Sequence, residues 1–85
     1  MNSIQIKLLF FAAARERSQC AESYISLESG STLHDLQSHV FIQFPTLSEI
    51  ASHLRWSVNH TFENQLDRVL YSGDEVAIIP PISGG

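Results

Sequence analysis

Hydrophobic and polar residues alternate at the start of the chain. Over residues 4–10 the large apolar side chains come at every second position: Ile4, Ile6, Leu8 and Phe10. A period of two is typical of a β-strand with one buried face. A second apolar run, Glu75 to Ile79, lies near the end of the chain. We expect these two strands to be the best buried of the sheet, with Phe10, Val76 and Ile78 in the core.

The middle of the chain changes to helical spacing. Apolar residues follow one another at three- and four-residue steps: Leu33, Leu36, Val40, Phe41 and Phe44. Such a stripe predicts an amphipathic helix, and Pro45 ends it. Thr32 and Asp35 have the spacing of a short capping box, in which side chains satisfy free amides of the first turn. The main helix is therefore expected to begin just after Thr32.

Weaker signals fill the remaining segments. Residues 12–17 favour a turn or two of helix, and residues 24–27 read as a strand. A second box, Thr46 to Glu49, predicts a short helix or an irregular excursion over residues 46–54. Short β segments are then expected at residues 56–58, at residue 62 and at residues 69–71, with turns at Asn59-His60 and Ser72-Gly73-Asp74. This order predicts an α+β fold with one main helix packed across a mixed sheet.

The length and charge of the chain limit its function. Eighty-five residues make a single domain, which we assign to residues 1–79. A net charge of -4 with only five Lys and Arg argues against nucleic-acid binding and suits a partner with a basic surface. Residues 7–14 imitate a secretory signal imperfectly, and no apolar run is long enough to span a membrane. Together with a lone cysteine, this predicts a cytoplasmic protein that does not act at a membrane.

Candidate catalytic and metal-binding residues form no recognisable motif. The four histidines lack metal-ligand spacing, so we expect no metal site: His34, His39, His53 and His60. Cys20 has no neighbouring His or Cys and is expected to be structural. We expect the aromatic residues Trp56, Phe62 and Tyr71 to fill the core rather than bind a ligand. The chain by itself therefore shows no catalytic site. Any reaction would either modify this chain or use it as a carrier.

The last six residues are the strongest candidate for a working segment. Residues 80–85 read Pro-Pro-Ile-Ser-Gly-Gly and follow the last predicted strand directly. Prolines favour an extended path and donate no amide to a sheet, while glycines have no Cβ to block entry into a narrow slot. Fully extended, such a tail reaches roughly 16 Å from the domain. We therefore predict that residues 80–85 are an extended, flexible tail presenting the carboxylate of Gly85 to a partner.

Three stretches resemble a known family. They are residues 7–12 (Lys-Leu-Leu-Phe-Phe-Ala) with Arg15-Glu16, then Val58-Asn59, and above all residues 73–85 (Gly-Asp-Glu-Val-Ala-Ile-Ile-Pro-Pro-Ile-Ser-Gly-Gly). Together they resemble the small, sulfur-carrying subunit of molybdopterin synthase. The resemblance implies a ubiquitin-like β-grasp, in which the first and last strands lie side by side as a parallel pair at the centre of the sheet.

The resemblance also implies a cycle of chemistry at the tail. An E1-like enzyme would use ATP to adenylate the carboxylate of Gly85, and a sulfur donor would convert it to a thiocarboxylate. The tail would then enter the large synthase subunit, in a heterotetramer, and give its sulfur to a cyclic pterin precursor to form the molybdopterin dithiolene. The arm that enters the partner would be Pro80, Pro81, Ile82, Ser83 and Gly84. No permanently bound cofactor is implied.

Other functions remain open from the residues alone. A ubiquitin-like modifier would be joined to lysines through Gly85 without passing on sulfur. A sulfur carrier of the thiamine or tRNA-thiolation pathways would use the same tail chemistry for another acceptor. The Pro-Pro-Ile-Ser-Gly-Gly ending after the Gly-Asp-Glu-Val turn favours the molybdopterin subunit among these relatives.

Overall fold

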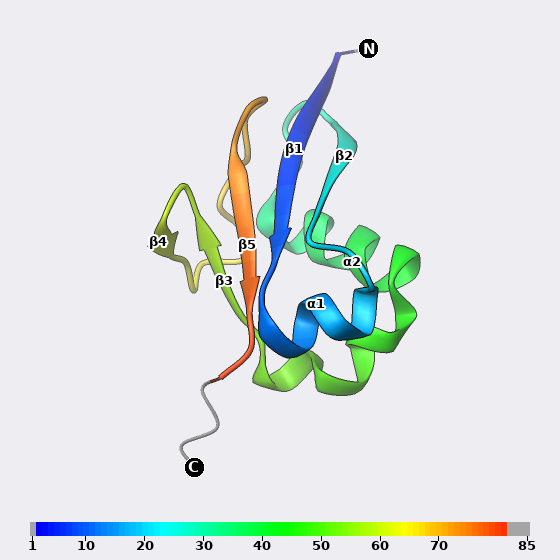
Figure 1. Cartoon of the computed structure of the whole chain (residues 1–85). Coiled ribbons are helices and arrows are strands. Elements are labelled where there is room, and N and C mark those ends of the chain that lie inside the picture. The colour runs from blue at the N-terminus through cyan, green and yellow to red at the C-terminus, as the bar shows by residue number, and fades with distance from the viewer. Residues whose placement is uncertain (1, 82–85) are drawn as a thin grey trace.

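A five-stranded mixed sheet carries the fold, and one long helix crosses one of its faces (Figure 1). The computed structural model describes residues 2–81. The strands are β1 (Ser3–Phe10), β2 (Glu22–Glu28), β3 (Arg55–Val58), β4 (Thr61–Phe62) and β5 (Glu75–Ile79). The helical elements are α1 (Ala12–Ser18), α2 (Leu33–Gln43) and the 3₁₀ segment η1 (Pro45–His53). The predicted α+β architecture is confirmed, with α2 as the main helix.

The first and last strands lie together at the centre of the sheet. The strand order is β2-β1-β5-β3-β4, and β1 pairs with β5 in parallel, Lys7 opposite Glu75 and Phe10 opposite Ile78. β3 runs antiparallel to the other side of β5. The expected central parallel pair is therefore confirmed, and both edges of β5 are occupied by neighbouring strands.

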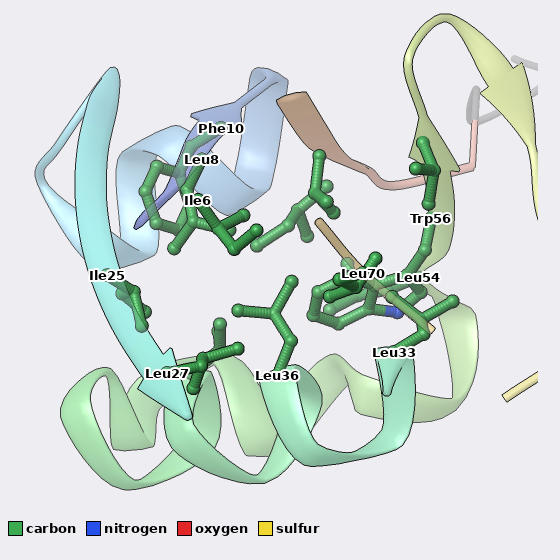
Figure 2. Packing of buried hydrophobic residues seen from close by; sticks show 14 of the residues in the cluster. Ile6, Leu8, Phe10, Ile25, Leu27, Leu33, Leu36, Leu54, Trp56 and Leu70 are labelled. Atoms are coloured by element: carbon green, nitrogen blue, oxygen red, sulfur yellow. The ribbon is translucent and has the colours of Figure 1, made fainter. Parts of the chain in front are cut away.

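The core lies between this sheet and α2. Side chains at alternate positions of β1 and β2 point toward Leu33 and Leu36 on the helix (Figure 2). Phe10, Val76 and Ile78 are all buried, as expected. The strands and the helix each have a single apolar side, as their hydrophobic periods predict. Packing these sides against each other buries both.

The capping box at the start of α2 is confirmed. The Asp35 backbone N–H donates to the Thr32 hydroxyl at 3.3 Å, and the Thr32 backbone N–H donates to the Asp35 carboxylate at 2.9 Å. The hydrogen bonds that the backbone N–H and the hydroxyl of Thr32 donate to the Asp35 carboxylate favour its ionised form and hold the pKa of Asp35 below its ordinary value of 3.8. The helix therefore begins at the residue that the sequence indicates.

The second predicted capping box, Thr46 to Glu49, is wrong. Helix η1 begins at Pro45, after Phe44, and no side chain caps it. The Thr46 hydroxyl instead donates to the Arg17 carbonyl at 2.7 Å, and the Glu49 carboxylate accepts from the Arg17 guanidinium at 2.9 Å. Both side chains thus link η1 to α1. Because Pro45 occupies the first position of η1, Thr46 lies inside the helix and cannot act as its N-cap.

The strand predicted at residues 69–71 is also absent. Val69 makes only an isolated bridge to Thr32. With both edges of β5 taken, this segment lies instead against the start of α2, where the carbonyls of Leu66 and Arg68 accept the N–H groups of His34 and Leu33 at 3.0 and 2.9 Å. The segment therefore satisfies backbone donors that the first turn of a helix cannot satisfy itself.

An ion pair closes the same segment. The Arg68 guanidinium donates to the Glu63 carboxylate at 2.8 Å, and the Gln65 backbone N–H donates to it at 3.0 Å. The hydrogen bond from Arg68, with the smaller contribution of the Gln65 amide, holds the pKa of Glu63 below its ordinary value of 4.5.

The aromatic residues divide between core and surface. Trp56 is buried, with 6% of its surface exposed, whereas Phe62 and Tyr71 are 49% and 66% exposed. The expectation that all three fill the core is therefore wrong for two of them. Phe62 projects from the sheet face that α2 does not cover, since it pairs with Ser57, whose neighbours Trp56 and Val58 point inward.

Candidate functional site

Strand β5 leads into the predicted tail from a fixed position. Ile79, its last residue, lies opposite Arg55 of β3, and the Phe11 backbone N–H donates to the Ile78 carbonyl at 3.1 Å. Pro80 follows at once and is half-buried, and Pro81 is exposed. The chain thus leaves the centre of the sheet at a point held from both sides, where proline cannot continue the ladder.

Most of the predicted tail lies outside the described residues. The structure describes Pro80 and Pro81, whereas Ile82, Ser83, Gly84 and Gly85 lie beyond it. The roles predicted for these six residues, and the division between a domain at residues 1–79 and a tail at residues 80–85, stay predictions.

An apolar surface lies next to the point where the chain leaves β5. It is on the sheet face opposite α2, and we name it the open-face patch: Leu9, Phe11, Phe62, Ala77 and Ile79. These side chains line a shallow hollow of about 240 Å³. Phe11 and Phe62 are 46% and 49% exposed, which is unusual for aromatic side chains in a small domain. Such a surface is suited to bind another protein.

Sequence reasoning missed this patch, although β1 contains a signal for it. The outward positions of β1 are polar at Ser3, Gln5 and Lys7 and become apolar at Leu9. A strand whose solvent face turns apolar at one end indicates a second contact surface there. The cross-strand neighbours that complete the patch, Ala77 and Phe62, come from elsewhere in the chain and have no such local signal.

Charged side chains border the open-face patch. The Lys7 ammonium lies 3.8 Å from the Glu22 carboxylate and 3.9 Å from that of Glu75. His60 lies 3.5 Å from the other oxygen of Glu75. The Arg55 guanidinium lies over the Phe62 ring, 3.9 Å from its centre. The patch thus has an apolar centre and a polar rim, which is the usual anatomy of a protein interface.

The predicted Asn59-His60 corner positions this rim. Both residues have positive φ, 51° and 74°, as the tight turn between β3 and β4 requires. The Asn59 side chain accepts from the Glu75 backbone N–H at 2.9 Å and donates to the Asp74 carboxylate at 2.9 Å. This side chain therefore fixes the β3–β4 hairpin to the start of β5.

The other sequence candidates are dispersed. The four histidines are all exposed, and residues 2–81 contain no group of three His, Cys, Asp or Glu able to hold a metal ion. The thiol of Cys20 is partly buried and donates to the Glu22 carbonyl at 2.8 Å. Within the same residues, no helix has the length and apolar character needed to cross a membrane.

Solved structures share this fold. Small archaeal modifier protein 1 (SAMP1) from Haloferax volcanii superposes with a TM-score of 0.85 at 22% identity, covering 95% of this chain and 99% of that one. Molybdopterin-converting factor from Helicobacter pylori, solved as a complex of its subunits 1 and 2, gives 0.73 at 20% identity, covering 96% and 100%. Ubiquitin from Caldiarchaeum subterraneum gives 0.66 at 11% identity, covering 99% and 100%. The ubiquitin-like β-grasp is thereby confirmed.

Sequence relatives extend the likeness over nearly the whole chain. The molybdopterin synthase sulfur carrier subunit of Arabidopsis thaliana is 36% identical over 84 residues, covering 99% of this chain and 86% of the relative. That of Chlamydomonas reinhardtii is 36% identical over 83 residues, covering 96% and 100%. The family model described as the ThiS family matches residues 8–85, which include the whole predicted tail. From its strand order, its full-length relatives and this match, the chain belongs to the ThiS family of ubiquitin-like β-grasp proteins.

Proposed function

We propose that this chain is the sulfur carrier subunit of a molybdopterin synthase. The observation that carries the proposal is the similarity to curated sulfur carrier subunits of this synthase, at 34–36% identity over nearly the whole chain. The structure supports it through the position of β5, which holds Ile79 at the sheet centre and is followed directly by Pro80 and Pro81.

The chemistry is proposed to take place at Gly85. Its carboxylate is ionised at neutral pH and is a poor electrophile, so it must first be activated. In an E1-like enzyme a carboxylate oxygen attacks the α-phosphorus of ATP, which releases pyrophosphate and leaves a glycyl adenylate. Sulfur at the oxidation level of sulfide, supplied by a donor, then attacks the glycyl carbon. The carbon–oxygen bond to AMP breaks as the carbon–sulfur bond forms, and release from the donor leaves a thiocarboxylate in which one oxygen is replaced by sulfur. ATP is thus consumed at the activating enzyme, and the carrier holds no resident cofactor.

Sulfur delivery requires a second protein. We propose that the open-face patch docks on the large synthase subunit, in a heterotetramer, while residues 80–85 enter its active site and give sulfur to a cyclic pterin precursor. The patch adjoins the base of the tail through Ile79, so a partner bound there is within the roughly 16 Å that an extended tail can span. Docking a rigid domain beside the reacting end lowers the entropy cost of placing that end in the active site.

Intact-mass spectrometry tests the proposed charging step. The chain is co-expressed with an E1-like enzyme of a molybdenum-cofactor pathway, and its mass should rise by the difference between one sulfur and one oxygen atom. A variant lacking Gly85 is the matched control and should keep its calculated mass. An unmodified full-length chain, under conditions that charge an established carrier, would contradict the proposal.

The same samples separate the proposed carrier from a modifier. A ubiquitin-like modifier would instead form adducts in which its last glycine is joined to lysine side chains of other proteins. Such adducts without a thiocarboxylate would assign the chain to the modifier class. Reconstitution with the large subunit and a cyclic pterin precursor then distinguishes molybdopterin synthesis from thiamine or tRNA thiolation.

A further inference from the structure

A second surface lies on the far edge of the sheet, between β2 and α2. It is a groove of about 570 Å³ whose lining includes Ser26, Leu27, Glu28, Asp35, His39 and Ile42. Ile42 is 80% exposed, the highest value among the large apolar side chains of residues 2–81. The groove therefore has an aliphatic wall on the helix and the backbone of an edge strand as its other side.

The edge of β2 has free hydrogen-bonding groups. Phe10 N–H donates to the Ala21 carbonyl and Ser29 N–H to the Asn2 carbonyl, so the odd-numbered residues of β2 face β1. The even-numbered residues therefore direct their backbone groups away from the sheet: Tyr24, Ser26 and Glu28. Within residues 2–81 the N–H groups of these three have no hydrogen-bond acceptor, and the Glu28 carbonyl accepts only from Ser31. Such an edge can accept an additional strand.

A strand added at this edge would also fill the groove. Alternate side chains of a strand point to opposite faces, so every second residue of the added strand would lie on the α2 side, over Leu27 and against Ile42. An aliphatic side chain at that position would cover the exposed Ile42. Backbone pairing and one apolar contact are the two elements of peptide recognition by strand addition.

The negative charge at this edge favours a partner segment that carries positive charge. Glu28 and Asp35 line the groove, and none of the eight lining residues is Lys or Arg. Glu22, at the start of the strand, is paired with Lys7 and adds less to this acidic character. A second copy of this chain is disfavoured, because it would bring a second edge carrying Glu22 and Glu28 against the first. In the antiparallel register with Tyr24 opposite Ser26, for example, Glu22 would lie directly opposite Glu28, and like charges in such positions are destabilising.

We propose that the β2–α2 groove binds an extended segment of another protein, which adds a strand to β2 and carries an aliphatic residue flanked by Lys or Arg. The site lies away from the point where the chain leaves β5. Ser26 is opposite Gln5, near the start of β1, whereas the chain leaves β5 beyond the residue opposite Phe10, on the other side of β1 (Figure 1). The groove can therefore be occupied while the tail and the open-face patch engage a partner, and the proposal does not rest on sulfur transfer.

NMR titration of the full-length chain tests this proposal. The probe is the capped heptapeptide Lys-Lys-Val-Ile-Val-Lys-Lys, and the matched control peptide carries Glu in place of each Lys. We expect saturable shifts of the Tyr24, Ser26, Glu28 and Ile42 amides with the basic peptide only. Exchange of the Ser26 amide with solvent should slow about tenfold when nine-tenths of the chain is bound, because exchange then proceeds from the free fraction.

Paired variants locate the binding surface. Glu28→Lys should weaken binding of the basic peptide about threefold to tenfold, because it replaces an attraction with a repulsion at an exposed site. Glu16→Lys changes net charge equally, on the exposed face of α1 outside the groove, and should leave the affinity unchanged. Ile42→Ser, at a position that does not support the core, should also weaken binding without lowering the unfolding temperature.

Several results would overturn the proposal. Shifts confined to the open-face patch, or shifts that never saturate, would show that the peptide does not use the groove. Equal weakening by Glu28→Lys and Glu16→Lys would show attraction to net charge alone. Sedimentation could instead detect a dimer in the absence of peptide. If the same β2 amides then shift between dilute and concentrated samples of the chain alone, the edge would be assigned to a second copy of the chain.

Discussion

Neighbouring isoleucines on β5 provide the sharpest test of the fold and the site together. Ile78 points into the core and has no exposed surface, whereas Ile79 is half-buried on the opposite face, within the open-face patch. Substituting each by Ala makes the same chemical change at adjacent positions of one strand. The loss of β propensity is therefore similar in the two variants. The difference between their losses in unfolding free energy measures the difference in burial of the two side chains.

The expected magnitudes differ severalfold. Ile78→Ala removes three buried carbon atoms, each contributing about 0.8 kcal/mol of transfer free energy. The cavity left in a tightly packed core raises the loss in unfolding free energy to about 3–4 kcal/mol. Ile79→Ala removes a side chain that already contacts water, so we expect a loss of about 1 kcal/mol. For a domain of this size, these values correspond to falls in unfolding temperature of about 12–30 °C and about 4–8 °C.

Thermal and urea unfolding, followed by circular dichroism, measure both losses. Calorimetric titration measures the affinity of each variant for the large synthase subunit. We expect Ile79→Ala to weaken this binding. An Ile78→Ala chain that remains folded should bind normally once its folded fraction is taken into account. Equal losses of stability in the two variants would refute the assignment of strand faces, and unchanged binding by Ile79→Ala would remove this residue from the docking surface.

Four further results are expected. Phe62→Ala should weaken binding to the large subunit about 30-fold if it anchors the docking surface, with little change in unfolding temperature; normal affinity in calorimetry would contradict this. Asn59→Ala should lower the unfolding free energy by about 1–3 kcal/mol, since a side chain bridging two strands is lost and Ala disfavours positive φ; unchanged urea unfolding would refute it. The stability contributed by the hydrogen-bonded carboxylates of Asp35 and Glu63 should be fully present above their ordinary pKa values, 3.8 and 4.5, and should be lost as pH drops from there through their lower folded values; a flat melting profile across that range would count against both. Gly84→Trp should abolish sulfur transfer while leaving the unfolding temperature unchanged, and normal molybdopterin production by this variant would argue against a narrow receiving slot.

Local patterns were enough to predict most elements of the fold. The alternation over residues 4–10, the helical stripe from Leu33 and the Thr32–Asp35 box are all confirmed. These features depend on residues close together in the sequence, whose periodicity determines which face is buried. The parallel pairing of β1 with β5 was implied by the family resemblance, and strand burial alone agreed with it.

Predictions failed where contacts over long sequence separations decided the outcome. Thr46 has the sequence of a helix cap but bonds to Arg17, 29 residues earlier in the chain. The segment around Val69 has the composition of a strand, yet no free edge of β5 remains for it. The usual burial of aromatic residues in small domains predicts Phe62 in the core, whereas the register of β3 with β4 places it on the open face.

The sequence by itself determined the elements, their buried faces and the Pro-Pro-Ile-Ser-Gly-Gly ending on which the proposed sulfur chemistry depends. Only the tertiary structure decided two further features: the open-face patch next to that ending, assembled from β1, the residue after it, β4 and β5, and a free β2 edge at the far side of the sheet. The physical reason is that a strand's own sequence specifies which side chains share a face, whereas strand order and register determine which faces become neighbours and which edges remain unpaired.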